Sequence, residues 1–154
     1  MDETRNAPSA EFVGRLLQSS EDQLCERLGI CMKAVASDPA IAGSYDPQVT
    51  YDGTTMGPLD DVRELGRRLF RRWSREAYKL ICGGELDNAE DRKKLLAAFS
   101  GGDVAVGAML ASLFVSGLGM APALAAIVAA LVLKYFFRPA YGEFCGLWQE
   151  KLPK

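Results

Sequence analysis

The chain has 154 residues, of which 49% are hydrophobic and 25% are charged, and its formal net charge is -2. A chain of this length and composition can bury one hydrophobic core, so wholesale disorder is excluded and a single domain is expected. The sequence contains no histidine. Catalysis by Ser-His-Asp or Cys-His groups within this chain is therefore excluded, and the commonest metal ligand is missing.

The cysteines are too widely spaced for a C-x-x-C pair: they are Cys25, Cys31, Cys82 and Cys145. Without histidine, a zinc site would need all four sulfurs from distant segments, so we expect no metal and no cofactor. Leucine or isoleucine precedes three of the four. This setting favours buried free thiols in a reducing compartment.

Residues 1–8 are polar and contain no apolar run. They predict a flexible N-terminus that is not a secretory signal, and hence a cytoplasmic protein. Residues 9–154 are expected to form one helical domain. Ser9 can cap a short amphipathic helix, and Ser20 with Gln23 has the pattern of a capping box for a second helix.

Turn-forming residues dominate the segment 37–58, which predicts a long loop. Such a loop serves either as a binding site or as a packed surface connection, and both interpretations stay open. If it binds, the side chains that we expect to make contact are Tyr45, Tyr51 and Asp52. No spacing of carboxylates or hydroxyls in the sequence indicates a catalytic site, so we expect that the protein is not an enzyme.

A long amphipathic helix is predicted from Pro58, at its start, to Cys82, after which two glycines end it. One face is apolar, and the other carries a row of arginines: Arg67, Arg68, Arg71, Arg72 and Arg75. Residues 62–84 contain seven basic and two acidic side chains, whereas residues 1–61 contain four basic and eleven acidic ones. The positive charge is therefore concentrated on this helix.

The arginine row can hold a protein partner, an anionic membrane or nucleic acid, or it can be solvated or neutralised by the acidic segment 1–61. Nucleic acid is not favoured, because no aromatic residues alternate with the arginines and the overall charge is negative. The next helix should be capped at Asp87 and end at Gly101.

Between Asp103 and Lys134 no residue is charged. Glycines and Pro122 divide this stretch into two antiparallel helices, which predicts an apolar hairpin at 104–137. Helices that are apolar on every side are enclosed by protein or by lipid. The first arm is shorter than the roughly 20 residues that cross a bilayer, so burial inside the protein is the favoured interpretation. A last helix follows Pro139.

The sequence thus predicts an all-α, single-domain bundle of about six helices around a central apolar hairpin. In organisation alone, this pattern resembles colicin-type pore-forming domains and Bcl-2-like proteins. The expected function is a non-enzymatic protein-protein interaction or adaptor module, part of a larger assembly. The alternative is a membrane-associated protein whose hairpin 104–137 inserts into a bilayer.

Overall fold

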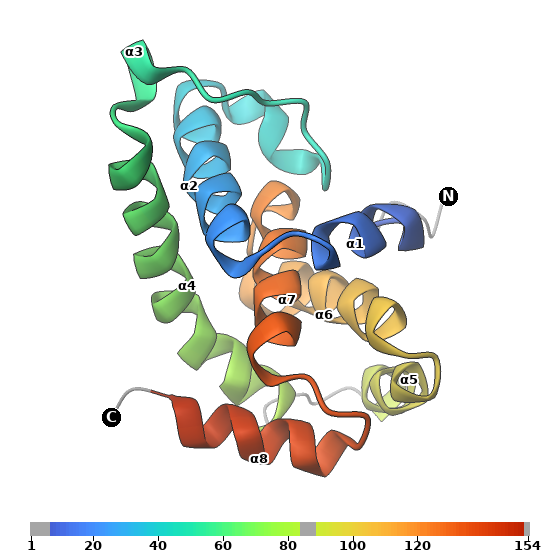
Figure 1. Cartoon of the computed structure of the whole chain (residues 1–154). Helices are drawn as coiled ribbons and strands as arrows, with labels where there is room; N and C mark the ends of the chain where they lie inside the picture. The colour runs from blue at the N-terminus through green and yellow to red at the C-terminus, as the bar shows by residue number, and fades with distance from the viewer. Residues whose placement is uncertain (1–6, 84–88, 153–154) are drawn as a thin grey trace.

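The computed structural model describes residues 7–83 and 89–152, and the fold in these ranges is entirely helical. Eight α-helices and one 3-10 helix pack together (Figure 1). In chain order they are α1 (Ala10–Leu17), α2 (Glu21–Ser37), the 3-10 helix η2 (Pro39–Gly43), α3 (Gly53–Met56), α4 (Leu59–Ile81), α5 (Ala89–Ser100), α6 (Asp103–Leu118), α7 (Pro122–Phe136) and α8 (Tyr141–Lys151).

The all-α prediction is therefore confirmed, but the described chain has eight α-helices and not about six. The short helix predicted after Ser9 is present as the eight-residue α1, whereas the four-residue α3 lies in the segment 37–58, where a loop was predicted. Helices this short are marginal by themselves and depend on caps and packing, which a periodic pattern does not reveal. The predicted cap at Asp87 and most of the segment 1–8 lie outside the described residues.

Side-chain caps fix the start of α1 and of α2 as predicted. The Ser9 hydroxyl accepts a hydrogen bond from the Phe12 N–H at 3.1 Å. At the start of α2, the Ser20 hydroxyl accepts from the Gln23 N–H at 3.1 Å, and the Gln23 amide oxygen accepts from the Ser20 N–H at 2.8 Å. This reciprocal pair satisfies two backbone donors that a helix end leaves open.

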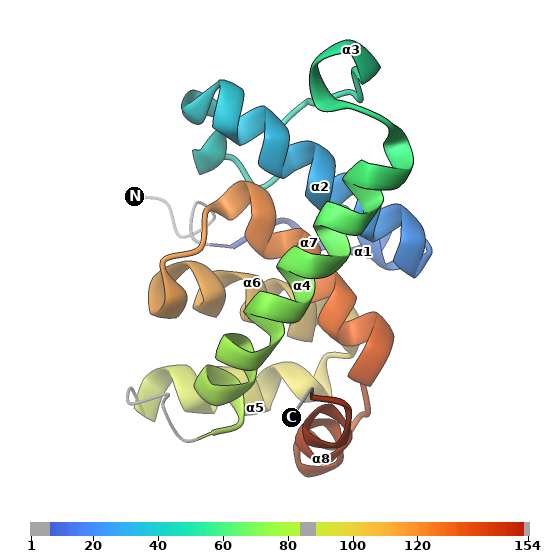
Figure 2. The same ribbon diagram turned by 90° about the vertical axis from the view of Figure 1, so that its left-hand side faces the viewer.

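The apolar helix α7 passes through the middle of the bundle (Figures 1 and 2), and every residue from Ala123 to Leu133 is buried. Helices α1, α2, α4, α6 and α8 all contact it. The preceding helix α6 is buried less evenly. Its side chains Val106, Leu110 and Phe114 are buried, whereas Ser116 is exposed. The two arms of the uncharged segment therefore differ in burial.

The break between α6 and α7 lies where the sequence predicts it. Gly119 has a φ of 69°, a left-handed conformation that ends α6, and Pro122 occupies the first turn of α7. Within the described ranges, no individual helix has the length and apolar character that crossing a bilayer requires. A bent pair, α7 with α8 at 92°, meets that test by length and composition only.

Glycines allow α2 and α4 to pack with their backbones in close contact. A Cβ atom added at Gly29 would overlap the carbonyl oxygen of Val62, and one added at Gly66 would overlap the carbonyl oxygen of Cys25. Neither glycine therefore tolerates a larger side chain without moving a helix. This contact fixes α4 along α2, and Arg68, Arg71, Arg72 and Arg75 of α4 are exposed.

A disulfide between Cys82 and Cys145 joins the end of α4 to α8. The prediction of free thiols is thus wrong for these two cysteines, whereas Cys25 and Cys31 are free and buried. Helix α8 folds back across the end of α4 (Figure 1), which brings cysteines 63 residues apart to a Cα–Cα distance of 5.7 Å. No local spacing encodes such a long-range contact.

Aromatic side chains hold α8 against the bundle. Phe144 and Trp148 are fully buried, and the Trp148 indole N–H donates to the Ser74 hydroxyl at 3.0 Å. The Tyr141 hydroxyl donates to the Ile81 carbonyl oxygen. These contacts and the disulfide together place α8 beside the arginine-bearing helix.

Candidate functional site

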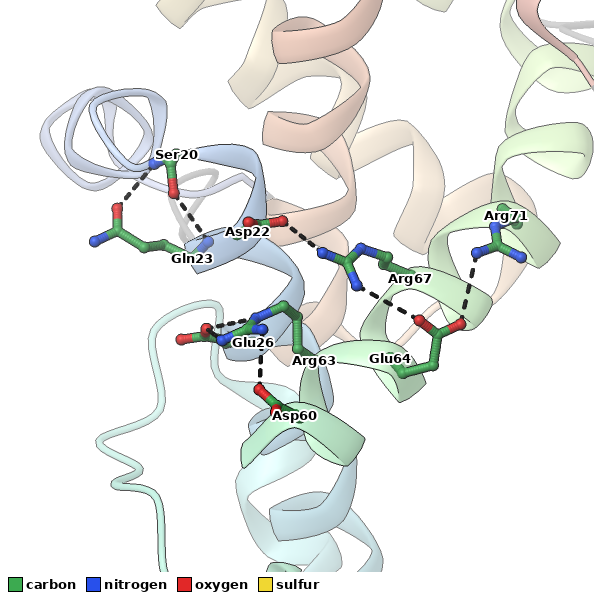
Figure 3. Close-up of polar contacts among 9 residues, drawn as sticks. All are labelled: Ser20, Asp22, Gln23, Glu26, Asp60, Arg63, Glu64, Arg67 and Arg71. Carbon is green, nitrogen blue, oxygen red and sulfur yellow. Dashed lines mark hydrogen bonds and ion pairs between the residues drawn. The ribbon is translucent and has the colours of Figure 1, made fainter. Parts of the chain in front are cut away.

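The arginine row of α4 divides into two parts with different surroundings. In the first part, Arg67 and the preceding Arg63, which we add to the row, face acidic residues of α2 and of α4 itself (Figure 3). The Arg63 Nε lies 2.7 Å from a Glu26 carboxylate oxygen, and an Arg67 Nη lies 2.6 Å from Asp22. These hydrogen bonds raise the pKa of both guanidinium groups, so both stay charged.

Residues of α4 complete this network. Asp60 lies 3.1 Å from Arg63, and Glu64 lies 3.5 Å from Arg67 and 3.6 Å from Arg71. Carboxylates of the acidic segment 1–61 therefore form ion pairs with the first part of the row. Such neutralisation within the chain is one of the roles that the sequence left open for the arginines. Arg67, a predicted contact residue, is engaged inside the chain.

In the second part of the row, Arg68, Arg72 and Arg75 are exposed. Among the residues that the structure describes, no carboxylate forms an ion pair with any of these three. Arg71 stands between the two parts, since its side chain is 60% exposed and Glu64 is its ion-pair partner among the described residues. We call Arg68, Arg71, Arg72 and Arg75 the basic face.

Two hollows flank the basic face, and Arg71 lines both of them. One, of about 550 Å³, is lined on α4 by Arg71, Arg72, Trp73, Arg75 and Glu76. The other, of about 420 Å³, lies where α2, α4, α7 and α8 meet. We call the second hollow the aromatic cleft, because Phe70, Tyr135 and Phe136 line it.

The loop residues that the sequence singles out have structural partners. The Tyr51 hydroxyl donates to the Gly57 carbonyl oxygen. The Asp52 carboxylate caps α3 by accepting from the Thr54 N–H at 3.0 Å and the Thr54 hydroxyl at 2.7 Å, and these bonds lower its pKa. Tyr45 packs against the core, where burial raises its pKa. The loop residues are not part of the basic face.

Sequence reasoning missed a second charged cluster, which ties this loop to the first two helices. The Asp46 carboxylate lies 3.4 Å from Arg15 and 3.1 Å from Arg27. Both guanidinium groups also lie 5.7 Å from the centre of the Phe12 ring. The three charged residues come from separate segments with no shared spacing, so no signal in the sequence could have joined them. These contacts hold the segment 37–58 against α1 and α2, as expected for a packed surface connection.

In the described ranges, no three cysteine or carboxylate side chains are grouped closely enough to hold a metal ion. Comparison with known proteins gives no matching family model, no matching curated protein and no matching solved structure. The geometry of the basic face and its two hollows is therefore the available basis for a functional proposal.

Proposed function

We propose that this chain is a non-enzymatic protein-protein interaction module that serves as an adaptor in a larger assembly. Its basic face would bind an acidic segment of a protein partner. The supporting observation is the uneven pairing along α4: acids of α2 and α4 neutralise Arg63 and Arg67, whereas Arg68, Arg72 and Arg75 are exposed without an ion pair among the described residues.

The chemistry of arginine suits this role. Its planar guanidinium group binds a carboxylate through two parallel hydrogen bonds and is less strongly hydrated than a lysine ammonium group. Each exposed ion pair contributes only about 0–1 kcal/mol, so a row of four must act together. Charges at the rim of an interface chiefly accelerate association, and salt weakens their effect. Binding should therefore fall as the salt concentration rises.

Charge reversal tests the proposal directly. A variant with Arg68→Glu, Arg72→Glu and Arg75→Glu is compared with the wild-type chain in fluorescence-anisotropy titrations of a labelled acidic peptide at low salt. We expect a loss of affinity of about tenfold or more, because attraction becomes repulsion at three positions. The replaced side chains are exposed, so the thermal stability should change little.

A matched control reverses three other exposed cations, Lys93, Lys94 and Arg138, which lie outside α4. This variant has the same net charge as the first one but an intact basic face. It should bind the peptide within about twofold of the wild type. An equal loss in both variants would show that only the bulk charge matters, and the basic face would then not be the interface.

The alternative function is insertion of the apolar hairpin 104–137 into a membrane. Residues 123–133 of α7 are buried, which favours a structural role for this segment in the core over insertion. Flotation with phosphatidylglycerol vesicles separates the two proposals. The chain should remain in the unbound fraction, whereas recovery with the vesicles that resists a wash in high salt or alkaline carbonate would favour insertion.

The cellular location is also a proposal. Disulfides are rare in cytosolic proteins and typical of oxidising compartments, so the bond between Cys82 and Cys145 speaks against the cytoplasmic location that the sequence predicts. Alkylation of free thiols in intact cells, followed by mass spectrometry, would distinguish the two locations. Alkylated Cys82 and Cys145 would show free thiols and would favour a reducing compartment.

A further inference from the structure

The aromatic cleft combines an apolar interior with a cationic edge. Phe70 and Phe136 are buried, and Tyr135 is 39% exposed. The Phe70 and Tyr135 rings are stacked with centroids 5.4 Å apart, and the Tyr135 and Phe136 rings are tilted with centroids 5.8 Å apart. A ligand entering the cleft would therefore meet three connected aromatic rings.

The charges around the cleft are unequally available. Asp22 and Glu64 hold Arg67, and burial is the main cause that raises the pKa of Tyr135. Arg71 forms one ion pair with a described residue, a contact of 3.6 Å with the Glu64 carboxylate oxygen that does not face Arg67. Lys151 at the end of α8 is exposed, and no ion pair with a described residue holds it. Asp22 and Glu64 are thus engaged with Arg67, while Arg71 and Lys151 at the edge are open to an incoming anion.

The size of the cleft limits its occupant. Pockets that take small ligands measure about 300–1,000 Å³, so a hollow of about 420 Å³ has room for one large side chain. Aromatic side chains bind well in such places, because offset-stacked and edge-on ring pairs add attraction beyond the buried area. Aromatic anchors in pockets also dominate the binding energy of protein interfaces.

We propose that the aromatic cleft receives one aromatic side chain of the acidic partner segment, next to a carboxylate that binds Arg71 or Lys151. This inference rests on the proposed function and specifies the partner's chemistry: an aromatic residue flanked by aspartate or glutamate. Continuity supports it, because Arg71 lines both the basic face and the cleft. One extended segment can therefore contact both.

The first experiment compares two labelled acidic peptides of equal length that differ at one central position, tryptophan or alanine. The tryptophan peptide should bind the wild-type chain about tenfold more tightly, as expected for a seated aromatic anchor. In the Tyr135→Ala variant this preference should shrink to about twofold, since one wall of the cleft is lost. Tyr135→Phe keeps the ring and should keep the preference.

A second measurement avoids any effect of a substitution on folding. A peptide with benzoylphenylalanine at the central position is irradiated with the wild-type chain, and the crosslinked residues are identified by mass spectrometry. Crosslinks are expected on Phe70, Tyr135 or Lys151. Crosslinks confined to other surfaces would overturn the inference.

The outcomes separate this inference from the proposed function. If both peptides bind equally and both lose affinity for the charge-reversed basic face, the cleft is not an anchor site, although the basic face still binds. If neither peptide binds, the proposed function fails and the anchor fails with it. If phosphatidylglycerol vesicles bind the wild type but not the Tyr135→Ala variant, the cleft takes a lipid and the inference is wrong.

Discussion

Removal of the disulfide is expected to destabilise the protein substantially. Cys82 and Cys145 are both half-buried, so replacing each by serine removes the covalent bond with little loss of packing. The bond closes a segment of 63 residues between the end of α4 and α8. Its effect should therefore arise mainly in the unfolded chain, which gains freedom when the two ends separate.

The chain-entropy relation gives the magnitude. For a loop set by the 63-residue separation, the lost entropy is about 14 cal/mol/K, or about 4 kcal/mol at 25 °C. Urea unfolding of a domain of this size has a slope of about 2 kcal/mol per molar. The urea midpoint of the Cys82→Ser, Cys145→Ser variant should thus lie about 2 M below that of the oxidised wild type.

Circular dichroism in urea provides the assay, with oxidised wild type, reduced wild type and the double variant side by side. Reduction should bring the wild type to the midpoint of the variant, and it should leave the variant itself unchanged. A loss below about 1 kcal/mol would refute the reasoning, because the unfolded chain would then gain little from the missing bond. A variant that responds to the reductant would show that another group is involved.

Three further predictions concern the core. Gly66→Ala should lower the unfolding free energy by about 2 kcal/mol or more, because the added methyl group meets a backbone carbonyl of α2. Gly146→Ala in α8 is the matched control, since the space there is open, and it should raise the unfolding free energy by about 0.5–1 kcal/mol. Ser74→Ala leaves the buried indole N–H of Trp148 without an acceptor and should cost about 1–3 kcal/mol by urea titration; a change below about 0.5 kcal/mol would contradict the role of that hydrogen bond. Burial raises the pKa of the Cys25 and Cys31 thiols, so at neutral pH both stay protonated and should resist a thiol reagent until urea exposes them. Rapid labelling of the folded chain would show that the two thiols are accessible.

Local signals in the sequence predicted most of the helix ends. The capping box at Ser20 and Gln23 and the glycine-proline break before Pro122 each involve residues a few positions apart, so their physics is readable from the sequence. The number of helices was predicted less well. The four-residue α3 depends on a cap from Asp52 and on its loop, and neither produces a periodic pattern.

The candidate site was only partly predictable. The amphipathic pattern of α4 identified its arginine row, but it could not show that Asp22 of α2 would engage Arg67 and leave Arg72 exposed. The aromatic cleft was not foreseen, because Phe70 and Tyr135 meet only after α7 has packed against α4. Contacts between distant segments follow from the tertiary packing, which spacing along the chain does not encode.

The position of α7 in the chain has a consequence for biosynthesis. About 85 residues separate the end of α2 from the start of α7, so a ribosome adding about 5–20 residues per second needs roughly 4–17 seconds to supply the helix that α2 packs against. During that interval the apolar sides of α1, α2 and α4 have no central helix to cover them. The nascent chain should therefore recruit holdase chaperones, and pausing of translation before Pro122 should increase its aggregation.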